Sequence, residues 1–224
     1  MKTLRMLRSI FISLLLLWGS SLPAQLVQEP VSRPQGFTLG VNLAGPLNKL
    51  LDGDRTGISF LTRMHLTEDW FFIGEAGFEN VSFTKEAYDY ESNGTFLRLG
   101  LARDMLPEKE AGSMDNILMG LQYGYALQEQ TAGRFSVFNG YWDDYHSRVG
   151  ANTLNTHWAE LSVGPRAEVF HNFFLSWQLN LRVVLVSSNS SALEPYIVPG
   201  YGIGDNKVNL GFAYTLEYFI PWKK

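Results

Sequence analysis

The sequence predicts an all-β chain that folds as an eight-stranded antiparallel up-and-down transmembrane β-barrel. The first supporting observation is that apolar residues recur at every second position in eight segments. Secondly, most of these segments run for about 10 residues, which suits a tilted strand that crosses a bilayer, whereas strands of water-soluble domains usually have about 5–6. Thirdly, long and short connections alternate, as in outer-membrane barrels with short periplasmic turns and long outer loops.

Eight segments carry the alternation. They lie at 37–44, 57–66, 70–79, 96–102, 117–128, 160–169, 175–186 and 208–220. The seventh, LSWQLNLRVVLV, shows it most clearly: its odd-numbered positions from Leu175 to Leu185 are all apolar, and Gln178, Asn180 and Arg182 lie between them. Because successive side chains of a strand point to opposite faces, this strand has one wide apolar face and one that carries a charge.

Two strands depart from the regular pattern. Pro165, inside the sixth segment, has no N–H to donate to a ladder, so we expect a β-bulge there. In the third segment Phe71 and Ile73 fall on the polar face, which predicts a slipped register in that half of the strand.

The connections divide by length. Long ones lie at 45–56, 84–94, 129–156 and 187–207, short ones at 67–69 and 171–172, and one of intermediate length at 105–115. A barrel of ten strands is the alternative if residues 133–148 form a hairpin of their own.

The N-terminus predicts a Sec-type signal peptide. Lys2, Arg5 and Arg8 precede a short apolar run at 10–18, and small residues suited to cleavage follow up to Ala24. The apolar run is too short to span a bilayer. We therefore expect a signal peptide at 1–24, a flexible lead-in at 25–36 and the barrel at 37–222, located in the bacterial outer membrane after Sec export.

Charge and cysteine content exclude several classes of function. Of the 18 Lys and Arg residues, three lie in the predicted signal, which leaves 15 against 22 Asp and Glu, a formal charge near −7. An acidic exported protein is a poor binder of nucleic acid, so we expect no nucleic-acid partner. The chain has no cysteine, which excludes disulfides, thiolate metal sites, a cysteine nucleophile and a lipid-anchored cysteine.

The polar faces of the predicted strands carry nine charged residues, four arginines and five glutamates. They are Arg63, Glu75, Glu79, Arg98, Glu160, Arg166, Glu168, Arg182 and Glu217. An eight-stranded barrel is just wide enough for side chains to fill its interior, where unpaired charges would be costly. We therefore predict a filled, salt-bridged interior without an open pore, in which Arg182 pairs with Glu160, Glu168 or Glu217 of a neighbouring strand.

Aromatic residues predict contacts with lipid and with the assembly machinery. Trp70, Phe173, Tyr218 and Trp222 fall at strand ends on the inferred periplasmic side, where an aromatic girdle would meet outer-membrane lipid. The last residues, YTLEYFIPWKK, partly match the C-terminal strand signal that the barrel assembly machinery reads during insertion, although Pro221 and two lysines interrupt and follow it.

The longest connection is rich in aromatic residues. It contains Phe135, Phe138, Tyr141, Trp142 and Tyr145, more than a simple linker needs. Such a loop either packs over the barrel mouth, extends a hairpin or meets an unknown partner at the cell surface.

No motif predicts a cofactor or a metal site. GYGIGD (200–205) has glycine spacing that resembles a phosphate loop but lacks the flanking parallel strand and helix, so we expect a flexible outer loop. DGD (52–54) and WDDYH (142–146) offer oxygen ligands without a full calcium-loop pattern.

Two alternatives to a structural or surface-interaction barrel without catalysis remain open. One is a lipid-modifying outer-membrane enzyme, with His157 and Glu160 near the rim, Ser162 deeper and His146 in the longest loop. The other is a soluble periplasmic barrel of lipocalin type, which would bind an apolar ligand and place its apolar face inside.

Several segments resemble a known family. DRTG (54–57), TFLRLGL (95–101), HWAELSVG (157–164), LEPYIVPGYG (193–202) and YTLEYFIPWKK (214–224) resemble a family of Bacteroidota exported outer-membrane-type β-barrel proteins catalogued as a domain of unknown function. The resemblance spans nearly the whole mature chain. It implies a barrel and brings no catalytic residues.

Overall fold

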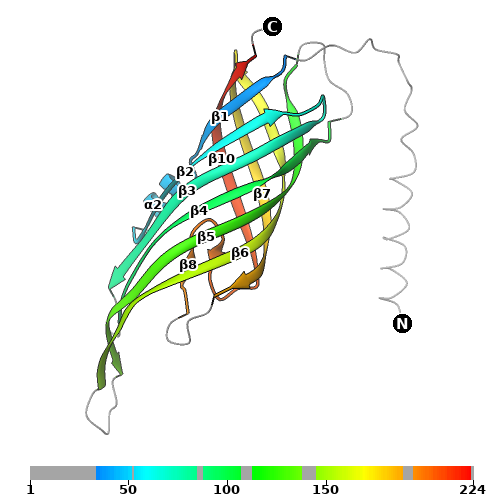
Figure 1. The fold of residues 1–224 in the computed structure, drawn as a ribbon. Coiled ribbons are helices and arrows are strands. Elements are labelled where there is room, and N and C mark those ends of the chain that lie inside the picture. Colours follow the sequence, from blue (N-terminus) through cyan, green and yellow to red (C-terminus); the bar gives the residue numbers. More distant parts are fainter. Residues whose placement is uncertain are drawn as a thin grey trace, which may run out of the picture. The chain divides into compact units, whose positions relative to one another are not determined.

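The computed structural model describes residues 34–51, 53–84, 88–106, 113–137, 145–188 and 194–222. Within them one antiparallel sheet of eight strands closes into a barrel, in the order β1-β10-β7-β6-β5-β4-β3-β2 (Figure 1). The barrel strands are β1 (Gly36–Asn42), β2 (Arg55–His65), β3 (Trp70–Thr84), β4 (Tyr88–Asp104), β5 (Asn116–Val137), β6 (Tyr145–Phe170), β7 (Phe173–Ser187) and β10 (Val208–Pro221). The predicted eight-stranded up-and-down barrel is confirmed.

In the part of the chain that the structure describes, two further elements accompany the barrel. A helix, α2 (Ala44–Leu51), follows β1, and a small hairpin of β8 (Ile197–Val198) and β9 (Gly202–Ile203) precedes β10. The predicted signal peptide at 1–24 and most of the lead-in lie outside the described residues. No helix among the described residues is long and apolar enough to span a membrane, a finding that concerns helices alone.

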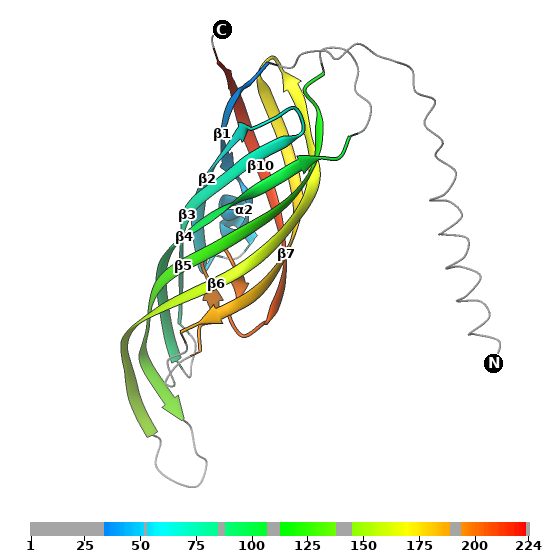
Figure 2. The same cartoon turned by 45° about the vertical axis from the view of Figure 1, so that its right-hand side comes forward.

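The strands are longer than predicted, so several predicted loops are wrong. Residues 84–94 were expected to form a long loop, but pairing continues to Thr84 with Asp89. The outward Ser82, Thr84 and Glu91 are polar, whereas the inward Val81, Phe83 and Tyr90 are buried in an apolar cluster with Ile197. Likewise β5 and β6 pair as far as Val137 with Tyr145, across shifts of register near Ala132. Figure 2 shows this hairpin reaching beyond the neighbouring strands. Because it continues two existing strands, the ten-stranded alternative is wrong.

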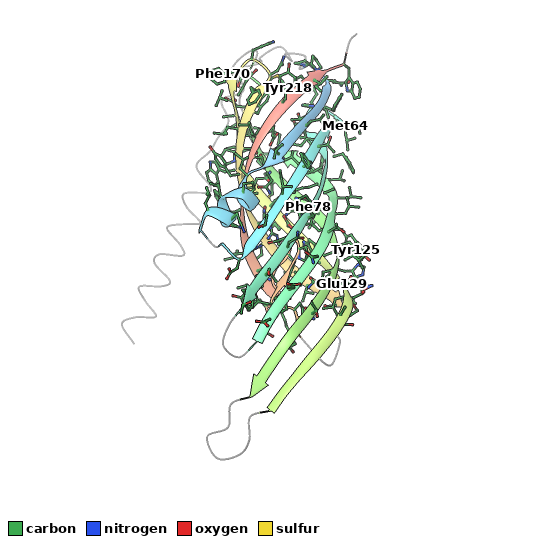
Figure 3. The ribbon with its side chains drawn as sticks, turned by 90° about the vertical axis from the view of Figure 1, so that its left-hand side faces the viewer. Met64, Phe78, Tyr125, Glu129, Phe170 and Tyr218 are labelled. Atoms are coloured by element: carbon green, nitrogen blue, oxygen red, sulfur yellow. The ribbon has the colours of Figure 1, made fainter. Side chains whose placement is uncertain are left out.

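The two faces of the sheet differ as the alternation predicts. On β10 the outward Leu210 is 83% exposed, whereas the inward Glu217 is 1% exposed. Figure 3 shows outward side chains along the whole wall, including Met64, Phe78 and Tyr218. Polar and charged groups therefore fill the interior, the reverse of the lipocalin-type arrangement.

Two expected irregularities are not found. Pro165 pairs with Ile117, and β6 keeps one register with β7 from Val163 to Arg166, so the predicted bulge is wrong. The ladder tolerates the proline because the pairing with β7 simply lapses beside it. Phe71 and Ile73 do point inward, but β3 keeps a continuous register with β2 and β4. They form a small apolar cluster with Ala102 and Leu118 instead.

Helix α2 was not predicted. The Oδ1 atom of Asn42 accepts a hydrogen bond of 3.0 Å from the backbone N–H of Ala44, which caps the helix at its start. Pro46 lies in the first turn, where its missing N–H costs nothing. β1 therefore ends at Asn42, paired with Thr215 on one side and Ser59 on the other.

Candidate functional site

A first ion-pair network surrounds Glu217 in the barrel interior. Its carboxylate accepts hydrogen bonds from Arg63 at 3.0 Å and from Nε of Arg166 at 2.8 Å. The hydroxyl groups of Ser176 and Thr215 each donate to it at 2.7 Å. These groups come from β2, β6, β7 and β10, so the network ties opposite walls of the barrel together.

The same network is held rigid by stacking and by further polar contacts. The guanidinium carbon of Arg166 lies 3.5 Å above the ring centroid of Phe174, a cation–π contact in a buried place. Its Nη1 and Nη2 atoms donate to Asn116 at 3.1 Å and Thr38 at 3.3 Å. A buried guanidinium needs this many partners because its lost hydration is otherwise uncompensated.

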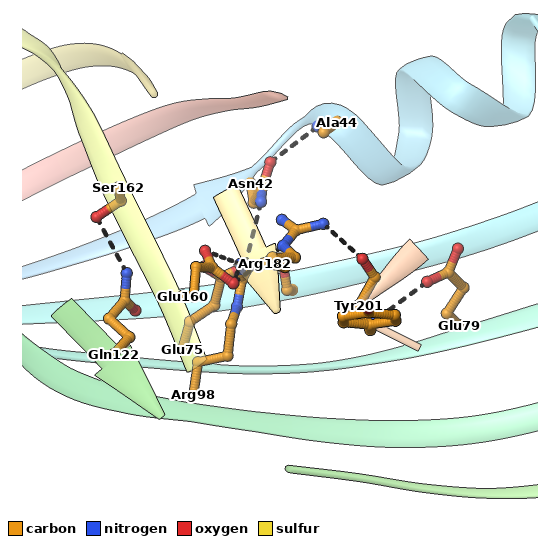
Figure 4. Close-up of polar contacts among 12 residues, drawn as sticks. Asn42, Ala44, Glu75, Glu79, Arg98, Gln122, Glu160, Ser162, Arg182 and Tyr201 are labelled. Atoms are coloured by element: carbon orange, nitrogen blue, oxygen red, sulfur yellow. Dashed lines mark hydrogen bonds and ion pairs between the residues drawn. The ribbon is translucent and has the colours of Figure 1, made fainter. Parts of the chain in front are cut away.

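A second network is centred on Glu160. Arg98 donates to it from Nη1 at 2.7 Å, and Arg182, its cross-strand neighbour on β7, donates from Nε at 3.0 Å (Figure 4). Arg98 also bridges to Glu75 at 2.7 Å. The Nε1 atom of Trp158 donates to Glu160 at 3.2 Å.

A third ion pair, Arg55 with Glu79, lies toward the opposite end of the barrel from the C-terminus of β10. The backbone N–H of Gly200 donates to the same carboxylate at 3.2 Å. Arg55 was missed in the sequence because it was assigned to a loop. Extending the alternation of β2 backwards from Arg63 by four steps of two places Arg55 on the inward face, and this was the available signal.

Eight of the nine predicted interior charges take part in these ion pairs. The ninth, Glu168, is half-buried at the turn between β6 and β7 and accepts a hydrogen bond of 2.6 Å from the backbone N–H of Asn172. Asn172 has a φ of 63°, in the left-handed region that asparagine enters more readily than most residues. Glu168 therefore holds a turn.

The connection between β7 and β10 folds back into the barrel. Val198 and Tyr201 are each 1% exposed and pack against Phe96 and Trp158. The carbonyl oxygen of Tyr201 accepts a hydrogen bond of 3.2 Å from Arg182. The expectation of a flexible outer loop at 200–205 is therefore wrong. Gly200 and Gly202 both have positive φ, which accounts for the glycine-rich sequence.

The predicted aromatic girdle residues lie together at the end of the barrel that carries the short turns. Trp70, Tyr218 and Trp222 are exposed, and Phe173 lies 6.0 Å from Tyr218 between ring centroids. Arg103 lies 6.0 Å from the ring of Trp70, which puts a cation beside this aromatic end.

The aromatic loop is only partly described. Phe138, Tyr141 and Trp142 lie outside the described residues, whereas Phe135 and Tyr145 stand on paired backbone of β5 and β6. His146 pairs through its backbone with Ser136.

Among the residues proposed for an enzyme whose side chains the structure describes, His157 does not come together with Glu160 and Ser162. His157 lies on the outer face, where its Nδ1 is 2.5 Å from the hydroxyl of Tyr123. Glu160 and Ser162 are both inside the barrel, each 1% exposed. The wall of the sheet therefore separates the histidine from the acid and the hydroxyl.

The family described as Domain of unknown function (DUF6048) matches residues 3–224. The chain belongs to this family. No curated protein sequence matches the chain. The resemblance drawn from the sequence is thus confirmed as far as a family of unknown function. A Bacteroidota origin stays a prediction.

Proposed function

We propose that this member of the family is a small outer-membrane β-barrel, exported by the Sec route, with a structural or surface-interaction role and no catalysis. Its partners would be bilayer lipid, the barrel assembly machinery during insertion and an unidentified molecule at the cell surface.

The observation that carries the proposal is the apolar outer wall. On β7 the outward residues are all apolar from Leu175 to Leu185, ten residue steps apart. At about 3.3 Å a residue and a tilt of about 40°, this stretch covers about 25 Å along the barrel axis, the height of the apolar band of a bacterial outer membrane. A water-soluble barrel has no reason to expose such a surface.

A row of outward-facing polar residues marks one edge of the apolar outer wall. Asn80, Asn93, Glu129 and Thr153 follow one another across β3, β4, β5 and β6 in the pairing register. Beyond this row Ser82 and Thr84 on β3 and Glu91 on β4 are exposed polar residues, as expected for strands that leave the bilayer. Figure 3 shows Glu129 beyond Tyr125, away from Tyr218.

The filled interior supports a role other than conduction. Ion pairs occupy the interior at three levels along the barrel axis. The β8–β9 hairpin fills the interior toward the end opposite the aromatic girdle. The long β5–β6 hairpin extends beyond the rest of the barrel, where a partner at the cell surface would contact it.

Flotation with lipid vesicles tests the membrane location. We expect the refolded chain to float with the vesicles through salt and carbonate washes, and to migrate faster in SDS unheated than boiled. Release by salt together with unchanged mobility would overturn the proposal.

A further inference from the structure

The barrel wall has a gap between β2 and β10. Because β1 ends at Asn42, it leaves residues 55–58 of β2 and 208–213 of β10 without a strand between them among the described residues. Where the gap begins, the backbone N–H of Leu43, just after β1, donates a hydrogen bond of 2.7 Å to the carbonyl oxygen of Tyr214 on β10. Val208, Leu210 and Phe212 on β10 face outward there and are more than half exposed, so the gap opens within the apolar wall.

Helix α2 covers the gap from outside. It contacts both β2 and β10, and Figure 3 shows it beside the wall. Its approach to β2 is as close as backbones allow, since a Cβ atom at Gly45 would collide with the carbonyl oxygen of Gly57. Leu47 and Leu50 on the helix are 46% and 82% exposed. The helix therefore presents leucines to the surroundings of the barrel.

A cavity of about 90 Å³ runs under the helix and joins the outer wall to the interior. Its wall includes Asn48 of α2, Phe212 of β10, and the charged residues Arg55, Glu79, Arg98 and Arg182. Phe212 is 54% exposed, whereas Arg98 is 3% exposed, so the cavity leads from the lipid-facing surface to buried arginines.

The charges that line the cavity favour an anion. Three arginines and one glutamate line it, and Glu75 and Glu160, which pair with Arg98 and Arg182, are not among its lining residues. The Nε atom of Arg98 is buried and has no hydrogen-bond partner among the described residues. A buried donor of this kind is costly unless a ligand or water accepts from it. Arg182 lies against the backbone of β10 at Gly211, next to the seam.

We propose that the seam between β2 and β10 is a lateral binding site for a single-chain amphiphile with an anionic head group. The carboxylate or phosphate enters beneath α2 and accepts hydrogen bonds from Arg55 and Arg98. The chain lies outside against Phe212 and the leucines of α2. The inference rests on the proposed outer-membrane location, because entry from the side requires the gap to face lipid.

Native mass spectrometry of the barrel in dodecyl maltoside tests this, with dodecanoate as the probe and dodecanol as its uncharged match. We expect a saturable 1:1 adduct with dodecanoate alone, weakened at least tenfold by Arg55→Gln. Arg103→Gln removes an arginine far from the seam and should leave the adduct unchanged. Equal adducts with both probes, or an adduct indifferent to Arg55→Gln, would overturn the site.

A reversible crosslink distinguishes a ligand that enters through the seam from one that enters through the open end of the barrel. The chain has no cysteine, so Asn48→Cys with Phe212→Cys gives the only two thiols, which a short reducible bis-methanethiosulfonate can join. The crosslink should abolish the dodecanoate adduct, and reduction should restore it. Two results would refute the lateral route. One is a dodecanoate adduct that survives the crosslink, and the other is inorganic phosphate that binds equally well before and after crosslinking. Either would show that a soluble anion reaches the arginines through the open end of the barrel.

Flotation of the same preparation distinguishes the two proposals. A barrel that floats with vesicles but gives no dodecanoate adduct would overturn the lateral site and leave the membrane proposal standing. A barrel that does not float would overturn both.

Discussion

Replacing Glu217 by glutamine should destabilise the barrel strongly. The substitution keeps the shape of the side chain but removes the one carboxylate that Arg63 and Arg166 share. All three side chains are at most 3% exposed, so the two guanidinium groups would be left without an anion in a place that water does not reach. Breaking a buried ion pair from one side costs about 3–5 kcal/mol.

The magnitude can be converted into a shift that urea titration detects. With a slope of about 2 kcal/mol per molar urea, a loss of about 4 kcal/mol lowers the midpoint by about 2 M. Tryptophan fluorescence of the barrel in micelles or vesicles reports the transition. The matched control is Glu129→Gln, a glutamate exposed on the outer face, which should change stability by less than about 0.5 kcal/mol.

The result that would refute this reasoning is a Glu217→Gln variant whose midpoint equals that of Glu129→Gln. Such an outcome would mean that water reaches the interior and that the arginines do not depend on Glu217. The filled interior would then be wrong as a physical description.

Three further predictions follow from the same description. Arg182→Ala should lower the unfolding midpoint by less than Glu217→Gln, because Glu160 keeps Arg98 as a partner; an unchanged midpoint would count against the Arg182–Glu160 pair. Planar-bilayer recordings should show no steady conductance, whereas well-defined open steps would contradict an interior closed by ion pairs and the β8–β9 hairpin. An epitope inserted between Val137 and Tyr145 should bind antibody on intact cells, and a tag after Lys224 only after permeabilisation; the opposite pattern would invert the proposed orientation.

The regular part of the fold could be predicted because one physical signal repeats. Apolar residues from Leu175 to Val183 alternate with the polar residues Ser176 to Arg182, and the same period of two places Glu160 opposite Arg182 on the next strand. Because successive side chains on a strand point to opposite faces, the charged residues of the interior could be identified from the sequence.

The irregular part depends on contacts between distant segments. The polar residues around Asp89 resemble a loop by composition, but pairing with Thr84 makes them strand. Residues 200–205 resemble a flexible loop, but Val198 and Tyr201 bury themselves against Phe96 from another strand. No local pattern specifies such partners.

Helix α2 was missed for a related reason. Its eight residues are too few for a helical period to stand out beside the strands. The signal that could have found it was the capping residue Asn42 followed by Pro46. The gap that the helix covers depends on where β1 stops, which the alternation of β1 does not indicate.

Spin labels on β7 test the central claim, an apolar wall in lipid around a polar interior, most directly. Single cysteines at the outward positions Leu179 and Leu181, and at the adjacent inward positions Gln178 and Asn180, can each be labelled in this cysteine-free chain reconstituted in vesicles. Collision rates should alternate with a period of two, with dissolved oxygen reaching the labels at 179 and 181 and a water-soluble nickel chelate excluded from them. Nickel access to those outward labels equal to that of a label in water would contradict the account.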